Sequence, residues 1–129
     1  MTAKARKSAD DVLSKIAEHC PTDFVVWGFE GDRLILRGGR DASGWRDLEI
    51  VFDDVLYMGL PVYLSTVTVR MADDAARAEL INLCDCDPAN DTFMMFELIE
   101  DADWPEGRKI HRVAAEAIRC RVPAPPDTT

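Results

Sequence analysis

Apolar residues recur along the chain with two different periods, and the change of period predicts where helices and strands lie. Between Ser8 and Pro21 they return at helical spacing, which predicts an amphipathic helix that Ser8 caps and Pro21 ends. A second helix is predicted after Asp73, which can cap it, because apolar side chains again fall on one side. Those side chains are Ala76, Leu80, Leu83 and Cys84.

Other apolar segments alternate with polar residues or are rich in β-branched and aromatic residues, and these predict strands. Residues 24–29 and 34–37 flank the turn-like sequence Glu-Gly-Asp-Arg, which predicts a hairpin and places Trp27 in the core. Residues 48–52 alternate as a strand with one polar face does. Further strands are predicted over residues 62–70 and 92–100.

Residues 109–122 fit both periods. The helical reading uses Ile110, Val113, Ala114, Ala117 and Ile118, whereas Ile118, Cys120 and Val122 alternate as in a strand. We favour a bent strand, in which Arg119 and Arg121 face solvent and Cys120 faces the core.

Taken together, these segments predict one α+β domain with a mostly antiparallel sheet and two helices. The domain spans residues 8–122. A flexible N-terminal tail, residues 1–7, is expected before it, and a proline-rich tail, residues 123–129, after it.

The net charge limits the classes of molecule that the chain is expected to bind. The chain has 24 acidic and 15 basic residues, for a net charge of −9. Nucleic-acid and anionic-membrane binding both depend on clustered positive charge, so neither is expected, and a basic protein is the more natural partner. The sequence contains no apolar stretch long enough to span a membrane and no secretory signal, so we expect a cytoplasmic protein.

The segment Leu-Cys-Asp-Cys-Asp is the main candidate for metal chemistry. Cys84 and Cys86 are separated by one residue, whereas zinc ligands usually come in pairs two to four residues apart. We therefore expect no metal and no other cofactor. The alternative is a metal-binding protein or enzyme that uses Cys84, Cys86, Asp85 and Asp87, with Cys20 and Cys120 completing a metal site.

No catalytic triad or phosphate-binding loop can be identified, so an enzyme is less expected than a binding protein. Any two of the many carboxylates could still meet as an acid and a base. Those noted are Glu49, Asp53, Asp54, Glu97, Glu100, Asp101 and Asp103.

An acidic loop with an aromatic residue is the predicted contact surface for a protein partner. Asp101, Asp103, Trp104 and Glu106 surround a hairpin tip, where an exposed tryptophan beside carboxylates suits protein binding. A second acidic loop adds Asp85, Asp87 and Asp91.

Three segments carry a resemblance to known proteins: residues 48–61, residues 93–98 and residues 112–122. In their order and hydrophobic rhythm, the chain from Cys20 to Val122 resembles small bacterial α+β domains of unknown function, some of which are grouped with immunity proteins of toxin systems. The resemblance implies a non-enzymatic protein that neutralises a partner by covering it. It implies no particular site residue.

The leading hypothesis is therefore a cytoplasmic, cofactor-free, immunity-like binding module that works through acidic loops. Besides the metal-dependent alternative, a structural homo-oligomer remains open. It would associate through an edge strand at residues 34–37 or through the apolar run at residues 55–64.

Overall fold

The computed structural model describes five stretches of the chain. They are residues 3–19, 23–39, 48–84, 93–101 and 108–122. Neither helix within these stretches is long and apolar enough to cross a membrane.

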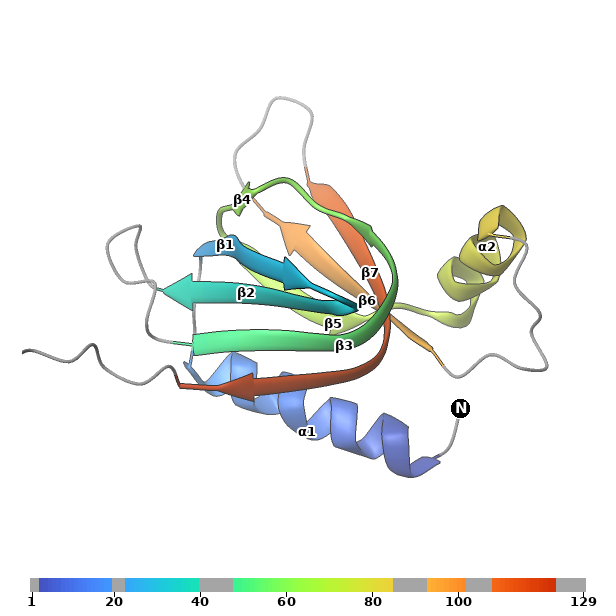
Figure 1. The fold of residues 1–129 in the computed structure, drawn as a ribbon, viewed down its shortest axis with the longest axis horizontal. Coiled ribbons are helices and arrows are strands. Elements are labelled where there is room, and N and C mark those ends of the chain that lie inside the picture. The colour runs from blue at the N-terminus through green and yellow to red at the C-terminus, as the bar shows by residue number, and fades with distance from the viewer. Residues whose placement is uncertain (1–2, 20–22, 40–47, 85–92, 102–107, 123–129) are drawn as a thin grey trace, which may run out of the picture.

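A seven-stranded antiparallel sheet, with strand order β4-β1-β2-β3-β7-β6-β5, forms the centre of the molecule (Figure 1). The α+β class predicted from the sequence is confirmed. The strands are β1 (Asp23–Glu30), β2 (Arg33–Gly39), β3 (Leu48–Gly59), β4 (Tyr63–Leu64), β5 (Val67–Met71), β6 (Met94–Glu100) and β7 (Lys109–Arg121).

The sheet curls strongly, because its two edge strands are neighbours in sequence. β4 and β5 lie at opposite ends of the strand order, yet only Ser65 and Thr66 separate them. Hydrogen bonds hold this corner: Thr66 N donates to Oδ1 of Asp23 over 3.1 Å, and Thr66 O accepts from Asp101 N over 2.9 Å. The sheet therefore has a concave inner face and a convex outer face.

Two helices cover different faces of the sheet. α1 (Ala3–His19) lies on the concave side, where Ala9 and Ile16 are buried in the main core, and it packs against β7 and β5. α2 (Asp74–Cys84) begins where predicted, because Asp73 Oδ1 accepts a hydrogen bond from Ala76 N over 2.9 Å. Its apolar side packs on the convex side of β6 and β7.

The main core fills the concave side of the curl and includes one aromatic pair. The rings of Phe52 and Phe96 lie with their centroids 5.4 Å apart. Inward-facing residues of β1, β2, β3, β4, β6 and β7 belong to this core. They include Phe24, Leu34, Leu36, Ile50, Leu98, Val113 and Ile118.

β7 resolves the ambiguity over residues 109–122. It is a strand, as predicted, because β3 and β6 pair with its two sides and supply the hydrogen bonds that a helix would have made internally. Arg119 and Arg121 are exposed and Cys120 packs against the core, as the alternation predicted.

Several predicted boundaries were wrong. α1 begins at Ala3, before the predicted Ser8 cap, so residues 3–7 are helical. The segment 62–70 is not one strand, since it divides into β4 and β5 around Thr66, whose φ of 53° interrupts extended backbone. β3 extends past the predicted residue 52 to Gly59, with a register shift between Val55 and Tyr57.

Candidate functional site

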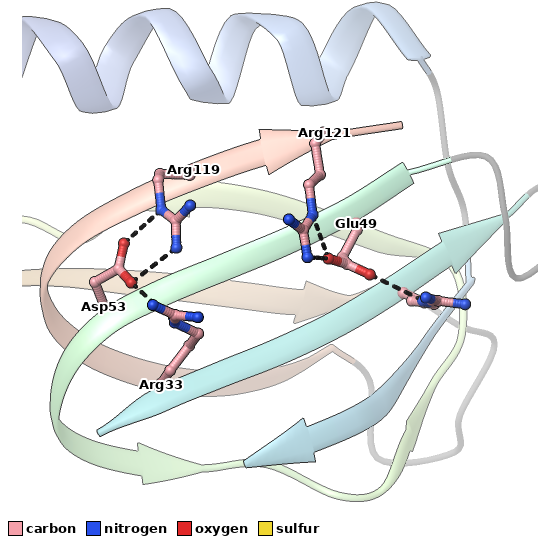
Figure 2. Close-up of polar contacts among 6 residues, drawn as sticks. Arg33, Glu49, Asp53, Arg119 and Arg121 are labelled. Atoms are coloured by element: carbon pink, nitrogen blue, oxygen red, sulfur yellow. Dashed lines mark hydrogen bonds and ion pairs between the residues drawn. The ribbon is translucent and has the colours of Figure 1, made fainter. Parts of the chain in front are cut away.

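The most organised group of polar side chains lies on the convex face of β2, β3 and β7. Residues of these strands that point inward fill the core, so the alternate residues point outward. Figure 2 shows carboxylates of β3 between arginines of the neighbouring strands. We call this group the arginine face, and it consists of Arg33, Arg37, Glu49, Asp53, Arg119 and Arg121.

One row of the arginine face is centred on Glu49. Strand register places this residue opposite both Arg37 and Arg121. Arg37 Nε donates to Oε2 over 3.0 Å, and Arg121 Nε donates to Oε1 over 2.6 Å. The Glu49 side chain is only 3% exposed, whereas that of Arg121 is 62% exposed. The buried carboxylate therefore fixes the positions of two guanidinium groups that face outward.

The second row is centred on Asp53. Arg119 donates to both carboxylate oxygens, from Nε over 2.7 Å and from Nη2 over 3.0 Å. Arg33 Nε lies 3.4 Å from Oδ1 on the other side. A two-pronged contact of this kind fixes the plane of the Arg119 guanidinium as well as its position.

The arginines keep both carboxylates ionised. Burial raises the pKa of the Glu49 carboxyl, but hydrogen bonds from Arg121 and Arg37 outweigh burial and leave this pKa below its ordinary value. At Asp53 the hydrogen bond from Arg119 is the largest cause of a lowered pKa. Both rows thus carry full charge at neutral pH.

Trp27 borders the Glu49 row and corrects the prediction that it lies in the core. Its side chain is exposed because a β-bulge between Val26 and Gly28 breaks the alternation of β1 at this residue. The Arg37 guanidinium lies over the indole, with Cζ 4.1 Å from the ring centroid. Arg37 is thereby held between Glu49 and Trp27.

Charge is unevenly distributed over the convex face. The arginine face has four arginines and two carboxylates, a surplus of positive charge in a chain whose net charge is −9. Beyond Asp53 the local charge of the convex face becomes negative. The pKa of Asp54 is raised, first by desolvation and then by repulsion and hydrogen bonding from Glu116. Repulsion from Asp32 and Asp53 raises it further. The face therefore has a positive end at Arg37 and Arg121 and a negative end around Asp54.

A similar arrangement recurs on β5, β6 and β7, but there a helix contributes to it. Arg70 Nε donates to Glu97 over 3.0 Å, and Arg112 Nε lies 3.5 Å from the other oxygen of Glu97 without forming a hydrogen bond. Arg112 also donates to Glu79 of α2 over 3.2 Å. This row attaches the helix to the sheet, whereas neither described helix packs on the arginine face.

Of the predicted partner-binding residues, the structure describes Asp101 alone. It is exposed and lines a cavity of about 180 Å³ together with Thr68, Arg70, Ile99 and Arg108. The other predicted contact residues, Asp85, Asp87, Asp91, Asp103, Trp104 and Glu106, lie outside the described residues.

Of the four cysteines, most also lie outside the described residues or have side chains that do. Cys120 is described, and burial raises the pKa of its thiol, an effect that Lys15 opposes. Cys20 and Cys86 lie outside the described residues, as does the side chain of Cys84. Within the described stretches no group of three or more His, Cys, Asp or Glu residues is arranged to hold a metal ion.

Sequence reasoning missed the arginine face as a unit. The sequence identifies Glu49 and Asp53 only as carboxylates, and Arg119 and Arg121 only as solvent-facing residues. The available signal was the placement of like charges at even spacing within single strands, because residues i, i+2 and i+4 of a strand share a face. Alternation does not reveal which strands are neighbours, so the opposite charges could not be paired.

No protein-family model matches the chain, and neither curated proteins nor solved structures give a significant match.

Proposed function

We propose that this chain is a cytoplasmic protein-binding module, immunity-like in that it acts by covering another protein. The arginine face and Trp27 form its contact surface. The observation that carries the proposal is the Glu49 row, where a buried carboxylate and an exposed indole hold Arg37 in one position. Tryptophan and arginine are the residue types that contribute most to protein interfaces, above all when they are already ordered.

The net charge supports a partner with a basic region. A chain with charge −9 attracts such a partner at long range, and the negative end around Asp54 offers it a matching surface. The acidic loops predicted from the sequence belong to the same proposal, with Asp101 as their described member.

The experiment that tests this proposal compares two exposed aromatic residues of β1. Trp27 is 52% exposed on the convex side, and Phe29 is 50% exposed but pairs with the inward-facing Leu34. A partner is identified by cross-linking and mass spectrometry and is then purified. We expect Trp27→Ala to weaken binding of that partner about thirtyfold, as loss of an interface hot spot does. Phe29→Ala is expected to bind normally.

Equal effects of the two substitutions, with both variants folded, would show that the contact surface lies elsewhere. Cross-linking of a partner is not sufficient by itself. The proposal requires that binding of the purified partner depends on Trp27.

A homo-oligomer is a second candidate function, supported by the apolar run at residues 55–64. Four of its large apolar side chains are exposed: Leu56, Tyr57, Val62 and Tyr63. The other segment expected to mediate self-association, residues 34–37, is part of β2, which lies between β1 and β3 and is not an edge strand. Multi-angle light scattering tests this candidate, because a dimer that Leu56→Ser and Val62→Ser convert to monomer would support it.

A further inference from the structure

We propose that the positive end of the arginine face binds a carboxylate side chain, Asp or Glu, from an acidic segment of the protein partner. This inference rests on the proposed function and specifies which chemical group the surface takes. The residues that would bind the carboxylate are Arg37 and Arg121, with Trp27 beside them.

The first argument is the number of hydrogen-bond donors. A guanidinium has five N–H donors. Arg37 uses its Nε on Glu49, and Arg121 uses Nε and Nη2 on the same carboxylate. Both oxygens of Glu49 already accept from an arginine, and its side chain is 3% exposed. Within the described stretches no further acceptor is seen for the remaining donors of Arg37 and Arg121, so these donors are available to a ligand.

The second argument is preorganisation. Free arginine side chains lose considerable rotamer entropy when they bind, which reduces affinity. Here that entropy is lost on folding, because Glu49 anchors both guanidinium groups and Trp27 stacks on one of them. A carboxylate that bridges Arg37 and Arg121 would repeat outside the chain the geometry that Glu49 has within it.

The third argument is charge, which limits both the place and the kind of ligand. Asp32, Asp54 and Glu116 repel a carboxylate from the other end of the convex face, so it is directed to Arg37 and Arg121. A nucleic acid brings many phosphates, which a chain of charge −9 repels as a whole. One or a few carboxylates from a protein segment match the excess positive charge at the positive end of the arginine face.

The test uses short labelled peptides and fluorescence anisotropy at low salt with the full chain. The probes are a tetraglutamate peptide, a tetraglutamine peptide, a phosphoserine peptide and a single-stranded oligonucleotide. We expect the tetraglutamate peptide to bind in preference to the others. Arg121→Gln is expected to weaken it about tenfold, the effect of losing one charge-assisted hydrogen bond.

Arg70→Gln is the matched control, because Arg70 also donates to a buried carboxylate and is 52% exposed, but it lies on β5. It is expected to bind the tetraglutamate peptide normally. Arg121→Lys keeps the positive charge while removing the planar fork, and we expect it to restore only part of the affinity. Thermal unfolding of each variant checks that the fold is intact.

The outcomes separate this inference from the proposed function. If the phosphoserine peptide or the oligonucleotide binds better than tetraglutamate, or if Arg121→Gln and Arg70→Gln act alike, the carboxylate assignment is wrong. Absence of tetraglutamate binding to the folded chain overturns it too. Either result leaves the Trp27-dependent binding of a purified partner to decide the proposed function.

Discussion

Arg121 donates a 2.6 Å hydrogen bond to Glu49 from a position 72 residues later in the chain. The contact exists because β3 and β7 pair in antiparallel register, which sets the two residues side by side. It joins the most buried charge of the arginine face to its most exposed one. Under the proposed function, one pair of residues serves both the stability of the fold and the binding of a partner.

Removing the Glu49 carboxylate should destabilise the fold. Glu49→Ala takes away the shared acceptor of two arginines, but both guanidinium groups can turn to water, so we expect a loss of about 1–2 kcal/mol in the free energy of unfolding. Urea unfolding measures it. Glu79→Ala breaks the exposed ion pair with Arg112 and should cost less than about 0.5 kcal/mol. Equal losses would mean that burial of Glu49 contributes nothing.

Acid should weaken the arginine face. The pKa values of Glu49 and Asp53 are lowered by folding, so their contribution is complete at neutral pH and is lost as pH falls below the ordinary carboxyl range towards the folded values. We expect unfolding free energy to drop steeply below about pH 4. The drop should be shallower in Glu49→Gln, which has one such group fewer. An identical pH profile in wild type and variant would contradict the assignment.

Asp54 should affect the pH dependence of stability in the opposite direction. Its pKa is raised, so its charged form is disfavoured in the folded chain, and stability is gained as pH falls through the folded pKa. Asp54 also has a φ of 53°, which asparagine tolerates well. We expect Asp54→Asn to raise the melting temperature at pH 7 and to have no such effect near pH 3, where Asp54 is protonated. If the higher melting temperature of Asp54→Asn persists at low pH, a cause other than the charge of Asp54 is responsible.

The contact of β2 with β1 should tolerate no side chain at Gly38. A Cβ at this position would lie 2.5 Å from Cε1 of Phe24, whose ring is fully buried. We expect Gly38→Ala to destabilise by about 1–3 kcal/mol through overpacking. Gly28→Ala is the control, since a Cβ there meets nothing within 4 Å. Equal melting temperatures for the two variants would show that the Phe24 ring moves aside readily.

Cys120 should react slowly with alkylating agents at neutral pH. Burial raises the pKa of its thiol, so less of the reactive thiolate is present than in an exposed cysteine. Peptide-resolved mass spectrometry after iodoacetamide treatment should show slower labelling of Cys120 in the folded chain than in urea. Labelling at the same rate in both states would exclude protection by the core.

The sequence predicts the class of fold and many of its elements for local reasons. Asp73 marks the start of α2, and alternation at Ile118 and Cys120 identifies the last part of β7, although Val122 lies beyond the strand and is exposed. These signals depend on residues close together in the chain. The division of residues 62–70 into two strands on opposite edges has no local signal of this kind, because it follows from the closure of the whole sheet.

The candidate site was less predictable than the fold. Glu49 in isolation is one carboxylate among many, and its role follows from pairing with Arg37 and Arg121 on two other strands. The exposure of Trp27 depends on a bulge whose position the hydrophobic pattern does not encode. Chemistry that is assembled across strands requires the register, and the register comes only from the folded sheet.

The two-residue link between β4 and β5 has a consequence for aggregation. An open sheet offers two unpaired margins to which a foreign strand can add. Here the margins share one corner, where Thr66 is held by Asp23 on one side and by Asp101 on the other. Exchange of an edge strand between two copies of the chain, in which β4 or β5 leaves its own sheet, would therefore also disrupt the hydrogen bonds that hold the other edge strand.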